Sequence, residues 1–450
     1  MIMRKSGEHY DFDCRQRDPL TVGLLRQSAA MSAESRIVLV RLRSNYTALG
    51  WSSAQPLGGP VKQLRITGAE LDLVDIPLKN PYVSSQSRGG KTSSRRTIIR
   101  LQTNVGLVGV GETTGTDEIF RLVEKYCRNL VGHDPFDVRE IWRRFIPNVY
   151  GNYHGRNGWL ALAGIDMACW DLAGKAREEP LWRLLGGKHR DEIPVAGLMS
   201  AYPLKVPETE LASVMRNKEN VPRIVDFARG IVDDFGFSAL KIKSAGIDWA
   251  WDASVMRALR TSFGPDVELR LDPNGAFTVS ESIRLGLQVQ ELDLEYLEDP
   301  TRGMDGMARL RRELPIPLAT NMCIIDFEQL SLGIRTHAVD AVLGDVYHWG
   351  GVLGFIELAA VCRTFGIDMG IHSFIEAGVG TAVNLHLAAV LPTLNHAIDA
   401  MLHQQACSII TETPAIVDGK LKVPDGVGLG VQLDENAIRS LSLAKVGISE

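Results

Sequence analysis

The sequence lacks the features that mark secreted, zinc-binding and membrane-spanning proteins. Its six cysteines lie far apart along 450 residues, and no two of them form a C-x-x-C pair. This spacing favours reduced thiols in a cytoplasmic protein over a disulfide framework or a zinc site. No apolar run reaches the roughly 18 residues that a membrane-spanning helix needs, so we expect no segment to cross a bilayer.

A strong net charge of either sign is also absent. The formal charge is −5, and 23% charged and 45% hydrophobic residues are the ordinary balance of a soluble globular protein. Because no charge excess attracts nucleic acid or an anionic membrane, we expect neither as a partner. We expect a small-molecule substrate and, as the protein partner, further copies of this chain in a homo-oligomer of unspecified size.

The first 62 residues differ in composition from the rest of the chain. They join a charged start, residues 1–18, to a stretch rich in proline, glycine and serine, residues 52–60. They lack the succession of basic, apolar and small residues that defines a secretory signal. Linker-like composition of this kind predicts a disordered leader without a chemical role, or coding sequence upstream of a start at Met31.

Residues 63–190 carry the pattern of a small α+β domain, with strands first and helices after them. The strand candidates are rich in β-branched residues and enclose a glycine-rich turn: residues 66–76, 97–103 and, for the turn, 106–111. The helix candidates are an amphipathic segment and an apolar one that runs on to the helix stop Gly186-Gly187: residues 134–145 and 159–172.

Residues 191–409 show a different pattern, in which short apolar runs alternate with segments that have the periodicity of amphipathic helices. The eight runs are residues 193–199, 239–244, 267–272, 296–298, 317–321, 341–345, 368–372 and 397–401. Alternating strands and helices predict parallel strands with crossovers, and eight such units close into a (β/α)₈ barrel. An open, doubly wound sheet is the alternative, but no G-x-G-x-x-G follows the first strand.

In a barrel the carboxyl ends of all strands meet at one mouth. Polar residues close six consecutive runs: Lys241 and Lys243, Asp272 and Asn274, Glu298 and Asp299, Asn321, Asp345, and His372. A single charge at a strand end is usually a solvated loop residue. Six in succession indicate a functional site, because polar side chains that converge in an apolar setting need partners or a metal.

Three of these residues offer oxygen donors on successive strands. They are Asp272, Glu298 and Asn321. Oxygen ligands without sulfur or imidazole suit Mg²⁺, whose octahedron substrate oxygens and water would complete. The alternative is a cluster of polar side chains that only bond to one another.

Two lysines and a histidine supply candidate bases. Lys241 and Lys243 are two residues apart in a strand, so both point into the mouth, where repulsion between them and from Mg²⁺ should lower the pKa of at least one of them. The alternative is that both reach solvent. His372 and Asp345 end neighbouring strands and suggest an acid/base dyad, although a lone histidine after a strand is more often a core residue.

Bases on two sides of a metal indicate proton abstraction beside a carboxylate. Such a metal would hold the substrate carboxylate and supply the positive charge that stabilises the enediolate formed when the α-proton leaves. Return of the proton gives a racemase, and loss of a β-hydroxyl gives a dehydratase. A barrel that binds metal and ligand without catalysis is a third alternative, which the intact Lys243, Asp345 and His372 argue against.

At these residues the sequence resembles the enolase superfamily, in its mandelate racemase and muconate lactonizing branch. The motifs GIDMACWDLAGK at 164–175 and LLGG at 184–187 are similar to the family's domain junction. The resemblance implies a capping domain in front of the barrel and a tail, residues 410–450, that returns to it through DGKLKVPDGVGLGV at 418–431. The pairing of lysine or histidine bases with Mg²⁺ is a known property of that superfamily.

Within this branch the third metal ligand is usually a glutamate. The segment ATNM at 319–322 and the segment NHAIDA at 395–400 instead resemble the glucarate dehydratase group, in which an asparagine holds that place. The resemblance implies a dehydratase of a sugar diacid that uses Mg²⁺. It implies that Lys243 and His372 are opposed bases, that His372 protonates the departing hydroxyl, that Lys241 assists Lys243, and that Asn274 bonds near the metal.

One departure concerns specificity. After Gly197 the glucarate dehydratases carry a tyrosine that faces the substrate, whereas Leu198 stands here. The remaining specificity is expected from capping loops at residues 84–96 and 152–157. The basic, polar stretch at residues 85–91 suits a diacid, but a solvated loop would have the same composition. An epimerase or racemase on the same scaffold is the second candidate function.

Overall fold

Two sheets organise the residues that the structure describes, which are 63–150, 155–202 and 207–450 of this computed structural model. The predicted leader, residues 1–62, lies outside the described residues. One sheet has four antiparallel strands, and the other has eight parallel strands with one short antiparallel strand at its side. Residues 63–450 belong to a single compact unit.

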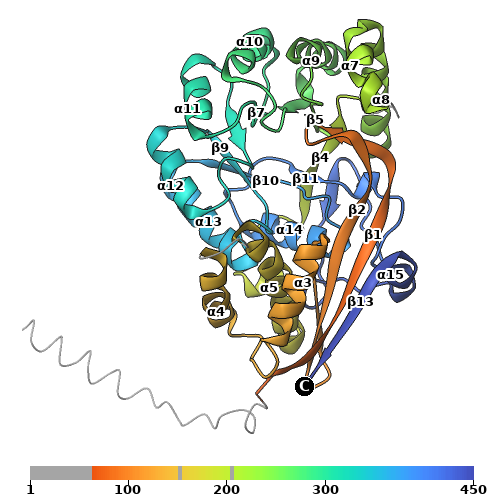
Figure 1. Ribbon diagram of the computed structural model, residues 1–450, viewed down its shortest axis with the longest axis vertical. Coiled ribbons are helices and arrows are strands. Elements are labelled where there is room, and N and C mark those ends of the chain that lie inside the picture. Colours follow the sequence, from red (N-terminus) through yellow and green to blue (C-terminus); the bar gives the residue numbers. More distant parts are fainter. Residues whose placement is uncertain (1–62, 151–154, 203–206) are drawn as a thin grey trace, which may run out of the picture. The chain divides into compact units, whose positions relative to one another are not determined.

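The antiparallel sheet joins both ends of this unit. Its strands, in spatial order, are β13 (Ser442–Ser449), β1 (Ile66–Ser84), β2 (Ser87–Thr103) and β3 (Val108–Thr114), and Figure 1 shows β13, β1 and β2 side by side. The C-terminal strand therefore returns to the N-terminal domain, as the sequence resemblance implied. The strands predicted at residues 66–76 and 97–103 are parts of the longer β1 and β2, and β3 occupies most of the predicted glycine-rich turn.

Four helices follow β3 along the chain: α3 (Asp117–Arg128), α4 (Val138–Tyr150), α5 (Gly155–Arg177) and α6 (Leu181–Leu184). Helix α3 begins where the Thr116 side chain accepts a hydrogen bond from Ile119 N, which satisfies one of the free amides of its first turn. Helix α5 packs so closely on the sheet that a methyl group at Gly111 would overlap the carbonyl oxygen of Gly164. Sheet and helices make the predicted α+β capping domain.

The parallel strands form the predicted barrel. In chain order they are β4 (Glu192–Ser200), β5 (Ala239–Lys243), β6 (Glu268–Asp272), β7 (Tyr296–Glu298), β8 (Leu318–Thr320), β9 (Ala341–Gly344), β10 (Asp368–Ile371) and β11 (Ile398–Ala400). Each lies within or overlaps one of the eight predicted apolar runs. The ladder is continuous from β10 through β4 to β11, and a parallel bridge between Met369 and Leu394 nearly closes the ring.

Helices alternate with these strands and surround them in Figure 1. They are α7 (Glu208–Arg216), α8 (Val221–Phe235), α9 (Trp249–Phe263), α10 (Val279–Val289), α11 (Met304–Glu313), α12 (Phe327–Thr336), α13 (Val352–Phe365) and α14 (Gly378–Val390). After β11 the chain instead runs through β12 (Lys420–Lys422), which pairs with β4, and α15 (Glu435–Leu441) to β13. No helix within the three described stretches combines the length and apolar character of a membrane span.

Candidate active site

The barrel brings the candidate residues together at the carboxyl ends of its strands. Lys241 and Lys243 lie on β5, and the parallel register places Lys243 opposite Asp272 on β6. Glu298 ends β7, and Asn321 directly follows β8. All five side chains are buried, because the strands that carry them form the interior of the barrel.

Two of the predicted ligands each have a buried oxygen without a hydrogen-bond partner within the described residues. These oxygens are Glu298 Oε1 and Asn321 Oδ1. A buried oxygen without a donor is costly unless a cation satisfies it. The third ligand, Asp272, is held by the backbone and side-chain amides of Asn274 at 2.8 and 3.0 Å. The donor set therefore fits a hard divalent cation such as Mg²⁺.

The third oxygen donor is an amide. Within the described part of the chain, no group of three His, Cys, Asp or Glu side chains is placed to hold a metal ion. The two carboxylates of Asp272 and Glu298 can form a ligand set together with the amide of Asn321. Asp299 is not available as a ligand, because its carboxylate is already hydrogen-bonded. Asp299 accepts hydrogen bonds from Thr320 Oγ1 at 2.5 Å and from Asn321 N at 2.8 Å, so it fixes the backbone that presents the amide.

The two lysines are paired with carboxylates. Lys241 Nζ donates to Asp399 Oδ2 at 2.5 Å and forms an ion pair with Glu298 Oε2 at 2.5 Å, and Lys243 Nζ donates to Asp272 Oδ2. Burial opposes the charge of Lys243, but Asp272, Tyr82 and Glu298 together outweigh burial and raise the pKa of Lys243 well above its usual range. Against burial, Asp399 and Glu298 likewise raise the pKa of Lys241.

The carboxylates opposite the two ammonium groups therefore counteract their mutual repulsion, and the lowered lysine pKa expected beside Mg²⁺ stays a prediction. Two-residue spacing showed that the ammonium groups share a face, but it did not show the carboxylates opposite them. Asp399, on β11, belongs to the same buried cluster through its contact with Lys241, and the sequence pattern did not single it out. Its signal was its position in the eighth apolar run, inside the segment NHAIDA. Asp399 also lies 3.5 Å from Arg270 Nη1, so it links Lys241 to a second buried cation.

Asp345 and His372 directly follow the paired neighbours β9 and β10, so they end neighbouring strands as predicted, but they do not form a tight dyad. His372 Nδ1 is 3.8 Å from Asp345 Oδ2, whereas His348 Nδ1 is 2.6 Å from the same oxygen. His348 N also donates to Asp345 Oδ1 at 2.6 Å. On its other side, His348 Nε2 accepts a hydrogen bond from Arg156 Nε at 2.7 Å, which places the ring proton on Nδ1.

The imidazole of His372 is held in its neutral form. Burial lowers the pKa of His372 to about 4, and the charges of Lys243 and Lys241 act in the same direction while Asp345 opposes them. Burial alone would raise the pKa of Asp345, but His348 holds it well below its usual range. Near neutral pH the site thus contains a neutral His372 beside an ionised Asp345.

The β1–β2 hairpin of the capping domain reaches the mouth of the barrel. Residues 84–96, expected to be a loop, form a hairpin whose turn contains Ser85 and Gln86, and Ser85 Oγ donates to Pro273 O at 2.8 Å. Arg88 of the same hairpin donates to the carbonyls of Ala245 and Gly246 at 3.1 and 3.0 Å. Arg88 therefore fastens the hairpin to the barrel, and its basic character does not by itself indicate a diacid substrate.

The second expected capping loop, residues 152–157, is only partly described, since α5 begins at Gly155 and residues 151–154 lie outside the description. Leu198, which stands where a tyrosine was expected, is buried in an apolar cluster with Leu78, Ile375 and Met401. Tyr82 of β1 packs on this cluster, and burial raises its pKa to about 12 while the charges of Lys243 and Asp272 act on it. A tyrosine therefore reaches the site from the capping domain.

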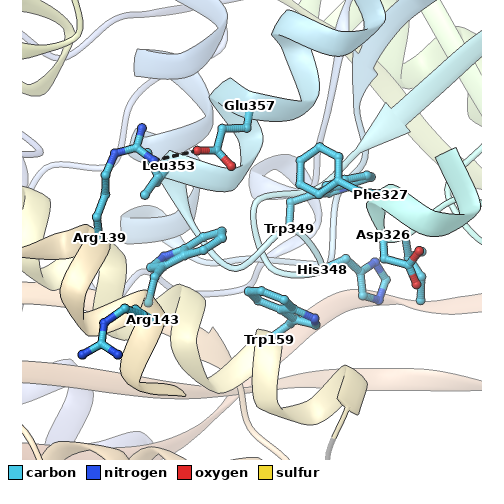
Figure 2. A pocket seen from close by; sticks show the side chains of 11 residues that line it. Arg139, Arg143, Trp159, Asp326, Phe327, His348, Trp349, Leu353 and Glu357 are labelled. Carbon is cyan, nitrogen blue, oxygen red and sulfur yellow. Dashed lines mark hydrogen bonds and ion pairs between the residues drawn. The ribbon is translucent and has the colours of Figure 1, made fainter. Parts of the chain in front are cut away.

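A pocket of about 260 Å³ lies next to the site, between the capping helices α4 and α5 and the segments that follow β8 and β9. Figure 2 shows the ion pair of Arg139 and Glu357 toward one end and His348 toward the other. Trp159 and Trp349 supply much of its aromatic wall. None of the candidate oxygen ligands lines this pocket, and His348 is the lining residue that connects it to the site. We therefore locate the candidate active site at the strand ends and not in this pocket.

Known proteins resemble this chain over both of its parts. Residues 69–186 match the family model of the mandelate racemase / muconate lactonizing enzyme N-terminal domain, and residues 223–437 match that of the enolase C-terminal domain-like family. A probable glucarate dehydratase from Streptomyces coelicolor is 33% identical over 398 residues, which are 84% of this chain and 91% of that protein.

Solved structures agree with this relationship. An enolase from Thermobispora bispora, complexed with magnesium and formate, has a TM-score of 0.75 and 34% identity, covering 84% of this chain and 92% of that one. An enolase from Mycobacterium smegmatis, complexed with tartrate, has a TM-score of 0.76 and 32% identity, covering 85% and 92%. With capping domain, barrel and sequence all in agreement, the chain belongs to the enolase superfamily, in its mandelate racemase and muconate lactonizing enzyme branch.

Proposed function

We propose that this protein is a Mg²⁺-dependent acid-sugar dehydratase, which removes water from a sugar diacid to leave a 2-keto-3-deoxy acid. The observation that carries the proposal is the pair of buried, unsatisfied oxygens of Glu298 and Asn321 beside Asp272, with a candidate base on either side. A purely structural polar cluster would satisfy its own oxygens, whereas a site for a cation and a carboxylate substrate leaves them free.

The two bases approach the substrate from different sides. Lys243 is on β5 and His372 follows β10, while the strands that end in the candidate ligands, β6 to β8, lie between them in the order of the sheet. A substrate held over the ligands would present opposite faces of its α-carbon to the two bases. Each base would then serve one stereochemical series.

A bound divalent cation would supply positive charge that acidifies the α-proton and competes with Lys243 for the charge of Asp272. Lys241, anchored between Glu298 and Asp399, keeps a positive charge next to Lys243. The positive charge of Lys241 beside Lys243 favours the neutral form of Lys243 once the cation has weakened the attraction between Lys243 and Asp272. We propose that Lys241 assists Lys243 in this way, and that Asn274 keeps Asp272 in place.

Elimination needs both an acceptor for the α-proton and a donor for the hydroxyl. His372 can serve as both, because its Nδ1 faces Asp345 and its Nε2 remains for the substrate. The C–H bond beside the carboxylate breaks and the proton moves to Nε2. The bond from the β-carbon to the hydroxyl then breaks, the proton passes to the leaving oxygen, and water departs. The remaining enol tautomerises to the 2-keto-3-deoxy acid.

The similar proteins support this choice of reaction. Besides the probable glucarate dehydratase, an L-talarate/galactarate dehydratase from Salmonella typhimurium resembles the chain, and both names describe loss of water from a sugar diacid. Tartrate, in the Mycobacterium smegmatis structure, is itself a hydroxylated diacid. These two relatives and the tartrate complex support a diacid as the substrate class.

Epimerisation or racemisation is the second candidate. A base on each face of one carbon is what a racemase needs, and an N-succinyl-L-Arg/Lys racemase from Bacillus cereus also resembles the chain. In this alternative, the proton that one base removes is replaced from the other side and the hydroxyl stays.

A screen of acid sugars separates the candidates. Protein stripped of metal and reloaded with Mg²⁺ is incubated with hexaric, pentaric and aldonic acids, and 2-keto acid and optical rotation are followed together. A dehydratase forms keto acid from at least one diacid. Rotation change without keto acid identifies an epimerase. If neither signal appears with any acid sugar, the proposed function is wrong.

A further inference from the structure

The backbone directly after His372 adopts a conformation that needs support. Ile375 has φ of 56°, in the left-handed region, where a β-branched residue is strongly disfavoured. This residue lies in the segment that joins β10 to α14, three positions from the candidate base. Strain of this kind persists only where surrounding contacts hold it.

Part of that support is local, since Phe374 N donates to Glu376 Oε2 and Ile375 N to Ser373 Oγ, and the rest comes from the capping domain. Ser94 Oγ donates to Ile375 O at 2.8 Å, and Arg96 Nη1 donates to Phe374 O at 3.2 Å. Ser94 and Arg96 both lie on β2, and Arg96 is only 1% exposed although it carries a charge. Two consecutive carbonyls after His372 are thus fixed by one strand of the other domain.

Glu112 of β3 fixes the end of the same segment. Its Oε1 accepts hydrogen bonds from Arg96 Nε and from Ala377 N, both at 2.7 Å, and its Oε2 accepts one from Gly380 N at 2.8 Å. Ala377 precedes α14 and has no side chain able to cap the helix. Glu112 is fully buried and supplies the missing cap, with its negative charge at the positive end of the helix.

An aromatic chain connects these contacts to His372. The ring of Phe374 packs edge-on against His372 at 5.5 Å and against Tyr347 at 5.6 Å between centroids. The guanidinium of Arg96 lies over the Tyr347 ring at 4.9 Å. Movement of Arg96 would therefore displace both a carbonyl and an aromatic contact on the His372 side of the site. The Lys243 side is anchored separately, through Asp272.

We propose that Arg96 and Glu112 are positioning residues of the capping domain that hold His372 in its reactive orientation without touching the substrate. The inference rests on the proposed function in one respect, namely that His372 is a base. It goes beyond that function by giving the capping domain a role in the catalytic geometry of one face of the site. The opposite face does not depend on this pair.

The first test asks whether the pair holds the segment, and it needs no substrate. Glu112→Gln keeps the size of the side chain but replaces one acceptor oxygen by a donor. The matched control is Asp72→Asn, which removes another buried ion pair of the same sheet, between Asp72 and Arg100 at 2.6 Å. Amide hydrogen exchange of residues 373–381 should accelerate in Glu112→Gln and stay unchanged in Asp72→Asn. Unchanged exchange in Glu112→Gln would overturn the inference.

The second test asks whether the effect is confined to one face. The probes are glucarate and its epimers at the carbons beside its carboxylates, with Mg²⁺ in D₂O. Glu112→Gln should slow α-deuteration in the series served by His372 by roughly 10- to 100-fold and leave the other series unchanged, since small misplacements of a base have effects of that size. Equal slowing in both series would contradict a positioning role. If the parent deuterates no probe, the proposed function fails while the exchange test still decides the positioning.

Discussion

His348 Nδ1 donates a hydrogen bond of 2.6 Å to Asp345 Oδ2, the carboxylate oxygen that lies nearest to His372. The carboxylate of Asp345 is therefore shared between two imidazoles, and His348, which is not a candidate base, lies closer to it than His372 does. Arg156 Nε, on the other side of the His348 ring, fixes which nitrogen carries the proton. The basicity of His372 should then depend on His348 as well as on Asp345.

Removal of His348 should make His372 more basic. Without its closer partner, Asp345 would interact with His372 alone, and the pKa of His372 should rise from its value of about 4. Because His372 acts as a base in its neutral form, the acid limb of kcat/KM should move to higher pH in His348→Leu. His348→Asn keeps a donor near Asp345 and is the control with little shift. An acid limb at the same pH in the parent and in His348→Leu would refute the shared carboxylate.

Metal dependence follows from the unsatisfied oxygens of Glu298 and Asn321. EDTA should abolish activity, and Mg²⁺ should restore it. Added Mg²⁺ should also stabilise the fold by about 2.7 kcal/mol at a hundredfold excess over Kd, which calorimetry detects without substrate. In Asn321→Leu, added Mg²⁺ should neither restore activity nor stabilise the fold. Full activity in a rigorously metal-free preparation would contradict this ligand assignment.

His386 gives a prediction on stability. Its Nδ1 accepts a hydrogen bond from Trp182 N at 3.3 Å, its Nε2 faces Leu429 O at 3.2 Å, and burial lowers its pKa to about 4. A histidine in the unfolded chain titrates near about 6.5, so the stabilisation is complete above that pH and is lost as pH falls toward 4. Relative to His386→Gln, the parent should lose up to about 1.4 kcal/mol per pH unit in this window. Denaturant unfolding at several pH values measures the difference in unfolding free energy between the parent and His386→Gln. If this difference does not change with pH, His386 is not held in its neutral form by burial.

Deletion of residues 1–62 should leave activity and melting temperature unchanged. The first strand of the capping sheet begins at Ile66, and residues 63–450 form a compact unit of their own. Steady-state kinetics and calorimetry of the truncated chain test this expectation. A truncated protein that folds but no longer binds substrate would show that the leader contributes to the site.

The barrel and its ligands could be predicted because each strand is a local signal. A short buried run ends in a polar residue, and the geometry of parallel strands then brings these ends together. Contacts between distant parts of the chain left no such signal. Asp399 reaches Lys241 across 158 positions, so spacing alone did not show this carboxylate, which raises the pKa of Lys241. The hairpin at residues 84–96 is polar and rich in small residues, which made it look like a loop.

The choice between His348 and His372 as the partner of Asp345 shows a second limit. The two histidines are three and 27 positions away from Asp345, and only the turn after β9 decides that the nearer one bonds to it. That turn contains Gly350 and Gly351, both with positive φ, so its course depends on backbone states that a pattern of apolar residues does not specify.

The division of labour between Lys243 and His372 is tested most directly by α-proton exchange and keto-acid formation measured together in D₂O, for both epimers of a turned-over acid sugar. His372→Asn should abolish keto-acid formation from either epimer, because the leaving hydroxyl loses its acid, while Lys243 still deuterates its own epimer. Lys243→Ala should spare dehydration of the epimer that His372 deprotonates and lose the other by roughly 10²–10⁴-fold. Keto-acid formation by His372→Asn at a rate near that of the parent would contradict the account.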